Sequence, residues 1–273
     1  MKKGAKAAFI GAGNMASAII GGIAKKRLIE PEDMWASNPT EPKLERLHET
    51  YGISTTTDNR EAAAHAEDFL FLCVKPIFLK EVIEEIRDVV PESAVIISVA
   101  AGKSLDFIGE CFGGSRKLIR IMPNTPALIG EGCTAVSLGA EAAKPEHSDK
   151  VEDAFELIQS FGEALEIPER LIDVAGQIGG ASPAWLCLAL EGMADGAVAV
   201  GMSRDMAYKF AAAAMAGTGK LALKTGSHPG SLKDMVTSPG GTTIQGVRVL
   251  EERAVRGAFM DAVIASYEKS NKM

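Results

Sequence analysis

A short apolar segment that runs directly into a glycine turn constrains the fold of this chain more than any other feature. Residues 7–10 are apolar throughout, and the next six residues follow the pattern G-x-G-x-x-A. Gly11 allows a tight turn, Gly13 lets a pyrophosphate approach the backbone, and Ala16 lets the following helix pack closely on the strand. Residues 15–25 complete the context as a predicted helix. The pattern predicts a dinucleotide-binding site, with a plain strand–turn–helix as the alternative.

Strand and helix patterns alternate from this turn as far as Pro168, which is typical of a doubly wound α/β sheet. Residues 69–74 are apolar on both faces, as a central parallel strand covered by helices requires. The other predicted strands are residues 34–38, 53–55, 94–100, 118–122, 132–138 and 164–167.

Only helical patterns follow Pro168. Residues 171–202 are almost continuously apolar, with an interruption at residues 179–183 that predicts a kink or a restarted helix at Pro183, with Ser182 as its cap. Ser203 is expected to cap the next helix, and three more are predicted at residues 229–236, 242–254 and 257–270. The sequence therefore predicts an N-terminal Rossmann-type doubly wound parallel sheet in residues 1–168. An all-α C-terminal domain is expected in residues 169–273.

Composition and charge exclude several classes of function. The net charge of −7 and the absence of a basic run argue against nucleic acid as a partner. Charged residues interrupt every apolar helix in the second half, so we expect no membrane span. The chain opens on a strand rather than a signal sequence, and its four cysteines form no Cys-x-x-Cys pair. Buried thiols in a reducing cytosol, and hence a cytoplasmic protein, are expected. The four histidines show no metal-ligand spacing, so no metal site is predicted.

The second predicted strand ends without the carboxylate that usually binds the ribose 2′-hydroxyl of NAD. Its last residues are Ser37 and Asn38, and Lys43 and Arg46 lie on the helix beyond. Hydroxyl, amide and cationic groups suit a 2′-phosphate better than a hydroxyl. The alternative is an ordinary helix cap at Asn38 or Thr40 with solvated basic residues nearby.

A second glycine turn, residues 237–243, lies between two helical patterns near the C-terminus. Gly240 and Gly241 carry no Cβ atoms that would keep a ligand from the backbone. Thr242 and Thr243 stand where the next helix begins, so unpaired N–H groups and the positive helix end point outward. Such a turn holds a carboxylate or phosphate. Taken alone, it is also compatible with a simple capped turn between helices.

These motifs together resemble the pyrroline-5-carboxylate reductase family over nearly the whole chain. The resemblance rests on segments 10–15, 74–76, 122–126, 180–184 and 238–243, which occur in the family's order at suitable spacing. Ala181 and Trp185 depart from the family pattern, where a serine and a tyrosine are common.

The resemblance implies reduction of pyrroline-5-carboxylate to L-proline by hydride transfer from NADPH, with NADH as a possible substitute. It assigns the cofactor to Ile10, Gly11, Ala12, Gly13, Asn14, Met15, Ser37, Asn38, Asn59, Cys73, Val74, Lys75 and Pro76. It assigns the substrate to Ser238, Gly240, Gly241, Thr242 and Thr243, with Thr243 in the catalytic role. It also implies self-association through the helical domain as a dimer or a larger ring of dimers, such as a decamer.

Two alternatives were weighed against this function. A β-hydroxyacid dehydrogenase shares the expected architecture but needs a base for the hydroxyl proton, and residues 174–203 contain no Lys, Arg or His. A nucleotide-sensing relative without catalysis would have no need of the anion-binding turn at residues 238–243.

Overall fold

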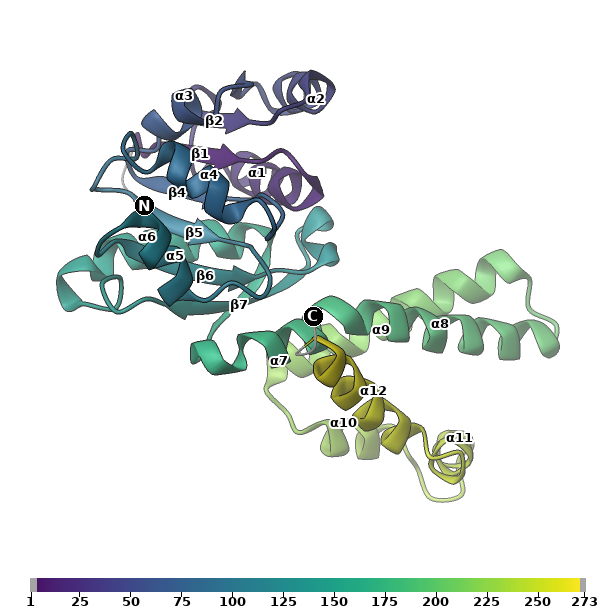
Figure 1. Cartoon of the computed structure of the whole chain (residues 1–273). Coiled ribbons are helices and arrows are strands. Elements are labelled where there is room, and N and C mark those ends of the chain that lie inside the picture. Colours follow the sequence, from purple (N-terminus) through teal and green to yellow (C-terminus); the bar gives the residue numbers. More distant parts are fainter. Residues whose placement is uncertain (1–3, 271–273) are drawn as a thin grey trace. The chain divides into compact units, whose positions relative to one another are not determined.

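The central sheet is built from strands that the apolar pattern of the sequence predicts. The structure, a computed structural model, describes residues 4–270. Among these residues, one sheet of eight strands has the order β3-β2-β1-β4-β5-β6-β7-β8 (Figure 1). The strands are β1 (Ala7–Ile10), β2 (Met34–Ser37), β3 (Ser54–Thr56), β4 (Phe69–Leu72), β5 (Val95–Ser98), β6 (Lys117–Met122), β7 (Gly132–Leu138) and β8 (Gly162–Glu166).

Helices cover both faces of this sheet, which explains why its central strands are apolar on both sides. In β1, Ala7 and Phe9 join one buried cluster, and Ala8 and Ile10 join the other. The first cluster is completed by α1 (Asn14–Lys26), α2 (Glu41–Tyr51) and α6 (Ser148–Ile158). The second is completed by α3 (Asn59–Ala64), α4 (Leu79–Ile86) and α5 (Leu105–Phe112). The doubly wound fold predicted from the sequence is confirmed.

Two features of the fold were not predicted. The β6–β7 pair is antiparallel, whereas the other neighbouring pairs are parallel. Residues 123–131 join these two strands through the short 3-10 helix η2 (Thr125–Ile129), and a parallel crossover needs a dozen or more residues. Helix α5 was also missed, although Ser104 caps it by accepting a hydrogen bond from the Phe107 N–H at 3.1 Å.

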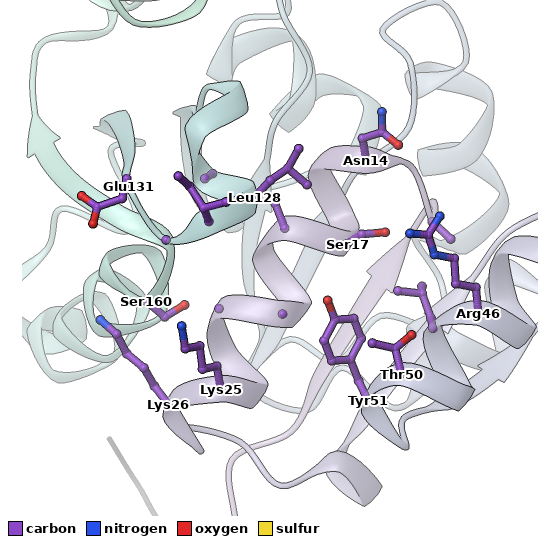
Figure 2. Close-up of a pocket in the computed structure, with 18 of the residues that line it drawn as sticks. Asn14, Ser17, Lys25, Lys26, Arg46, Thr50, Tyr51, Leu128, Glu131 and Ser160 are labelled. Carbon is purple, nitrogen blue, oxygen red and sulfur yellow. The ribbon is translucent and has the colours of Figure 1, made fainter. Parts of the chain in front are cut away.

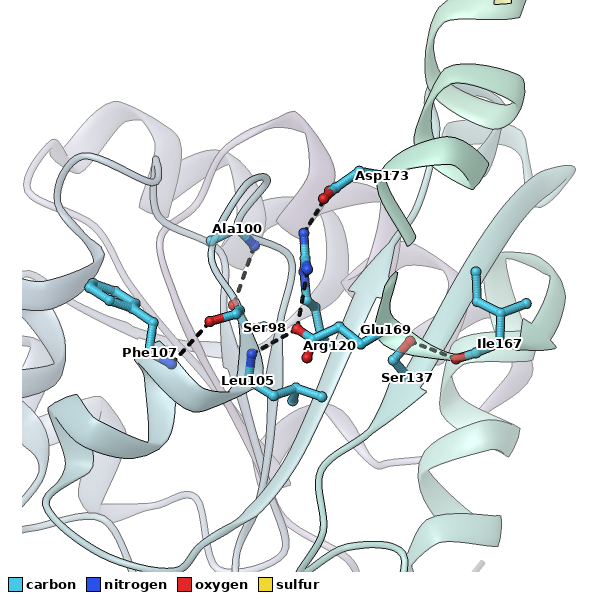
Figure 3. Close-up of polar contacts among 10 residues, drawn as sticks. Ser98, Ala100, Leu105, Phe107, Arg120, Ser137, Ile167, Glu169 and Asp173 are labelled. Atoms are coloured by element: carbon cyan, nitrogen blue, oxygen red, sulfur yellow. Dashed lines mark hydrogen bonds and ion pairs between the residues drawn. The ribbon is translucent and has the colours of Figure 1, made fainter. Parts of the chain in front are cut away.

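A buried arginine fixes the segment through which the chain leaves the sheet. Arg120 on β6 is 3% exposed. Its guanidinium lies 3.2 Å from the Glu169 carboxylate and 2.7 Å from the Asp173 carboxylate (Figure 3). Glu169, in the 3-10 helix η5 (Glu169–Leu171), also accepts a hydrogen bond from the Leu105 N–H at 2.8 Å. The two carboxylates compensate the buried cation and attach η5 and α7 (Ile172–Gly176) to the sheet.

The interruption predicted near Pro183 is present as a change of helix type and not as a break in the chain of helical residues. A π-helical turn, η6 (Gln177–Ala181), connects α7 directly to α8 (Ser182–Ala199). Ala181 is itself helical, with φ −90° and ψ −35°, so the prediction that Ser182 caps a restarted helix is wrong. A wider π turn just before Pro183 accommodates a residue that has no N–H to continue the regular ladder.

The remaining helices form a second compact unit. By its internal contacts the chain divides into residues 1–180 and 181–273. The domain boundary proposed from the sequence, at residue 168, stays a prediction. Beyond α8 the helices are α9 (Arg204–Thr225), α10 (Pro229–Met235), α11 (Thr242–Glu252) and α12 (Val255–Ser270). Ser203 occupies the N-cap position of α9 as predicted, but its side chain makes no capping hydrogen bond.

Exposure of the cysteines differs in part from the expectation. Cys111 is buried and Cys73 is half-buried, but Cys133 and Cys187 are exposed within the chain. The prediction of generally buried thiols is therefore wrong for the last two, although all four are free. Across residues 4–270, every helix is too short or too polar to cross a bilayer.

Candidate functional site

The turn after β1 presses directly against the turn after β4. Gly11 has a left-handed φ of +102°, and its N–H donates to the Ser37 carbonyl at 2.9 Å. A Cβ atom at Gly11 would lie 2.8 Å from the Cys73 carbonyl oxygen, closer than real Cβ contacts allow. Glycine is therefore required here both by the backbone conformation and by the approach of the second turn.

The first turn of α1 leaves its N-terminal backbone groups available. Gly13 is the N-cap residue, and no side chain caps the helix. A Cβ atom built on Gly13 would have no neighbour within 4 Å, so the space in front of the turn is open. Unpaired N–H groups at a positive helix end form a site for a pyrophosphate. The predicted segment from Ile10 to Met15 is thus arranged as a dinucleotide site requires.

Asn38 braces this turn from the end of β2. Its Oδ1 accepts a hydrogen bond from the Ala12 N–H at 3.2 Å, and its Nδ2 donates to the Thr40 hydroxyl at 2.6 Å. Asn38 is 7% exposed, so its amide orients the glycine turn rather than facing solvent. Thr40 stands at the N-cap of α2 without a side-chain capping bond. The alternative of a helix cap is thus confirmed in position for Thr40, whereas Asn38 binds the glycine turn and does not cap α2.

Ser37 and Asn59 meet beside this brace. The buried Ser37 hydroxyl donates to Asn59 Oδ1 at 2.8 Å, and Asn59 Nδ2 donates to Glu85 Oε2 on α4 at 2.8 Å. The sequence predicted Ser37 and Asn59 but not Glu85. Glu85 comes 26 residues after Asn59, on a helix whose pattern indicated only an apolar face, and no sequence signal connects the two.

The segment after β4 supplies the opposite wall of the glycine turn. The Cys73 N–H donates to the Ile10 carbonyl at 2.8 Å, which continues the β1–β4 pairing past the last strand residue. Burial raises the pKa of the Cys73 thiol to about 12. The raised pKa favours the neutral thiol, which is the less nucleophilic form, at physiological pH. Val74 and Pro76 are half-buried beyond it, and Lys75 is exposed.

A groove of about 870 Å³ runs along the outer flank of α1, between α2 and η2. Figure 2 shows Asn14 and Arg46 toward one end of the groove, and Lys25, Lys26 and Ser160 toward the other. Lys43 also lines it. The predicted cations Lys43 and Arg46 thus lie on the same flank as Asn14 of the glycine turn, which suits an anionic group near the ribose end of β2.

The C-terminal glycine turn has the predicted form. Gly241 donates its N–H to the Ser238 carbonyl at 3.0 Å, and Gly240 between them has a left-handed φ of +69°. Pro239 and Gly240 thus occupy the two central positions of a type II turn. Helix α11 begins at Thr242 with Gly241 as its N-cap, and no side chain caps it.

The start of α11 is therefore open to a ligand. Thr242 and Thr243 are its first two residues, and both are exposed within the chain. The Ser238 hydroxyl lies over Gly241, since a Cβ atom there would be 2.3 Å from Ser238 Oγ. Backbone N–H groups and three hydroxyls gather at one helix end. The simple capped turn is not what the structure contains, because the helix lacks a side-chain cap.

One cluster could be mistaken for a metal site. Ligand atoms of Glu141, Glu146 and His147 lie within 4.8 Å of one another. Hydrogen bonds from Lys144, Ser115 and His147 hold the pKa of Glu141 down to about 2. These bonds account for the Glu141 carboxylate as part of a surface ion-pair cluster, and the sequence assigned no metal to it.

The structure brings the predicted residues together in two groups. The carboxyl ends of β1, β2 and β4 gather the predicted cofactor residues, which all belong to the first compact unit. The predicted substrate residues, from Ser238 to Thr243, all belong to the second. Their assignment to cofactor and substrate stays a prediction.

Comparisons with known proteins cover the whole of this arrangement. A family model described as pyrroline-5-carboxylate reductase dimerisation matches residues 169–273. A second, described as NADP oxidoreductase coenzyme F420-dependent, matches residues 6–102. The pyrroline-5-carboxylate reductase of Escherichia coli is 43% identical over 268 residues, which are 98% of each chain.

Solved structures agree with the sequence comparison. A pyrroline-5-carboxylate reductase from Coxiella burnetii superimposes with a TM-score of 0.91 at 30% identity, and covers 99% of this chain and 98% of its own. The enzyme from Plasmodium falciparum, solved with NADP bound, has a TM-score of 0.83 at 28% identity, with coverage of 99% and 98%.

Replacing each glycine of the N-terminal turn with alanine should have a different effect. Gly11→Ala should destabilise the protein by about 1–3 kcal/mol, because of the left-handed φ and the contact with the Cys73 carbonyl. Gly13→Ala should change stability by less than about 0.5 kcal/mol, because its Cβ meets no protein atom. Both should weaken dinucleotide binding at least about tenfold. Thermal unfolding and calorimetric titration with NADP⁺ measure the two effects. Equal destabilisation by the two changes would contradict the close contact described between Gly11 and the Cys73 carbonyl.

Proposed function

The chain belongs to the pyrroline-5-carboxylate reductase family, and on that premise we propose which of its residues perform the reaction. Members of this family reduce L-1-pyrroline-5-carboxylate to L-proline, the last step of proline biosynthesis, and this chain is such an NAD(P)H-dependent oxidoreductase. The β-hydroxyacid dehydrogenase and the non-catalytic relative are not favoured. The proposals concern the cofactor residues, the substrate residues, the preferred cofactor and the size of the assembly.

We propose that the glycine turn from Ile10 to Met15 holds the cofactor pyrophosphate. The uncapped start of α1 and the empty space before Gly13 support this assignment. Ser37, Asn38 and Asn59 border the adenosine ribose, and the segment from Cys73 to Pro76 forms the wall beside it. Lys43 and Arg46 on α2 supply positive charge for a 2′-phosphate, so NADPH is the preferred cofactor.

The substrate carboxylate is assigned to the start of α11. The observation that carries this proposal is the left-handed Gly240 followed by an uncapped helix, which leaves several N–H groups directed outward. Ser238, Gly240, Gly241 and Thr242 hold the carboxylate. Thr243, one residue further along the helix, is within reach of the ring nitrogen of so small a substrate.

The reaction requires little acid–base chemistry from the protein. A cyclic imine is basic enough to be protonated, and its iminium carbon accepts a hydride without help from a strong protein acid. NADPH supplies that hydride when it is bound. The residues of this chain fix the substrate by its carboxylate, and the Thr243 hydroxyl steadies the ring nitrogen as it becomes an amine. This accounts for a helix α8 without a Lys, Arg or His residue.

The chain self-associates, and the helical unit has the surface for it. Of the residues in α8, only Ala194 is buried within the chain. Leu186, Leu188, Met193 and Val200 are between 42% and 87% exposed. We propose that a partner subunit covers these residues, in a dimer or in a larger ring of dimers such as a decamer.

We also propose that the enzyme works in the cytoplasm. All four cysteines are free, and exposed thiols such as Cys133 and Cys187 persist in a reducing compartment.

The cofactor assignment predicts that NADPH is preferred over NADH. The double change Lys43→Gln, Arg46→Gln should lower kcat/KM for NADPH about tenfold or more while leaving NADH nearly unaffected, because only NADPH carries the phosphate. Initial rates at 340 nm with both cofactors measure the ratio.

Lys25→Gln is the matched control for this pair. Lys25 lines the far end of the same groove, so its loss removes a charge without removing a phosphate contact. Equal or higher kcat/KM with NADH in the unchanged protein would refute the NADPH preference.

The substrate assignment predicts that Thr243→Ala lowers kcat/KM for pyrroline-5-carboxylate about 5- to 150-fold. This range corresponds to loss of one hydrogen bond worth about 1–3 kcal/mol. The affinity for NADP⁺ and the assembly state should change little, because Thr243 is assigned to the substrate alone. Steady-state kinetics, titration and sedimentation measure the three quantities.

Thr243→Ser separates the hydroxyl from the rest of the side chain. It should retain most of the activity, since the hydroxyl remains. If Thr243→Ala melts at a lower temperature but turns over normally, Thr243 is structural and the catalytic role is lost.

A further inference from the structure

A chain of hydrogen bonds leads from helix α4 to the ribose end of β2. Glu85 Oε2 accepts from Asn59 Nδ2 at 2.8 Å, and Asn59 Oδ1 accepts from the Ser37 hydroxyl at 2.8 Å. Ser37 is fully buried, Asn59 is half-buried, and Glu85 is exposed. The three side chains come from different elements and meet in the proposed cofactor site.

The carboxylate at the end of this chain determines which way the amide faces. An ionised carboxylate only accepts hydrogen bonds, so Asn59 must turn its nitrogen toward Glu85. Its oxygen then faces Ser37, and the single proton of the Ser37 hydroxyl is used in that bond. This orientation uses one of the two Asn59 N–H groups and turns the Asn59 oxygen, with its remaining lone pair, toward the end of β2.

Lone pairs discriminate between the two cofactors. The 2′-hydroxyl of NADH can donate a hydrogen bond to them, whereas the 2′-phosphate of NADPH only accepts and carries negative charge. Many NAD-binding folds place a carboxylate at the end of the second strand to bind this hydroxyl. In this chain β2 ends in Ser37, and the Glu85 carboxylate on α4 acts indirectly, through Asn59.

The cation next to Asn59 is already occupied. The Arg60 guanidinium binds both oxygens of Asp88, at 2.7 and 2.9 Å, and also donates to the Glu85 carbonyl at 2.6 Å. It is therefore held against the end of α4 and is not free to bind a phosphate. Positive charge for the phosphate is assigned to α2, where Lys43 and Arg46 lie.

We propose that Glu85 is a specificity-determining residue that acts through Asn59 to limit the preference for NADPH. It orients the Asn59 amide so that the amide oxygen accepts from a 2′-hydroxyl, and its own charge opposes a 2′-phosphate. Lys43 and Arg46 act in the opposite direction. This inference rests on the proposed location of the cofactor ribose and deepens it.

Binding, rather than turnover, tests this proposal. Calorimetric titration of the full-length enzyme gives the dissociation constants of NADP⁺ and NAD⁺. The ratio of these two constants is determined for each variant and compared between variants. Glu85→Gln should shift the ratio toward NADP⁺ by about 3- to 10-fold, because the amide of Asn59 becomes free to reverse and the charge is lost. A shift smaller than about twofold would overturn the proposal.

Two controls separate orientation of the amide from loss of charge. Glu84→Gln removes the neighbouring carboxylate on α4, which forms an ion pair with Lys80 at 3.9 Å, and should leave the ratio unchanged. In an Asn59→Ala background, Glu85→Gln should shift the ratio less than it does in the unchanged protein, because only the loss of charge remains once the intermediate amide is gone. An equal shift in either control would show that Glu85 acts as a distant charge, and would overturn the role of Asn59.

The outcome is independent of the proposed NADPH preference. If the unchanged enzyme binds NAD⁺ more tightly, the preference proposed for Lys43 and Arg46 fails. The shift caused by Glu85→Gln still decides the role of Glu85, since it is measured relative to that starting ratio.

Discussion

The cofactor half of this enzyme depends on the close contact between Gly11 and the Cys73 carbonyl. Because no Cβ intervenes, the turn after β1 can lie against the turn after β4 while Asn38 holds it from the other side. These contacts fix the start of α1, whose N–H groups we propose to bind the cofactor pyrophosphate. The specificity residues are grouped around the same turn: Asn38 contacts it directly, and Ser37 accepts its N–H through the backbone carbonyl.

The proposed substrate site is also a glycine turn at the start of a helix, and it lies in the second compact unit. A left-handed glycine again precedes a helix start without a side-chain cap, which we propose as the site of the substrate carboxylate. In this proposal anchoring and orientation are sufficient, because the substrate is an activated, easily protonated imine. The proposed cofactor selectivity is a charge balance at the ribose, with Lys43 and Arg46 favouring a phosphate and Glu85, through Asn59, opposing it.

The local motifs of this fold could be predicted from the sequence, and the long-range polar contacts could not. The apolar runs predicted the sheet and the two glycine patterns predicted the two turns at helix starts, because both features are set by neighbouring residues. Arg120 with Glu169 and Asp173, and Asn59 with Glu85, join residues far apart in the sequence, so no periodicity reveals them. The π turn before Pro183 was missed for a different reason. Glycines followed by serine and proline usually end a helix, but here the ladder widens by one residue and continues.

The central claim is that a carboxylate held at the start of α11 positions the imine for hydride transfer. The most direct measurement compares NADPH oxidation with pyrroline-5-carboxylate and with 1-pyrroline, which has the same C=N bond but no carboxylate. We expect rapid turnover of the first and a kcat/KM at least about a hundredfold lower for the second, because the anchor supplies orientation. Similar kcat/KM values for the two compounds would show that the substrate carboxylate is not needed to position the imine.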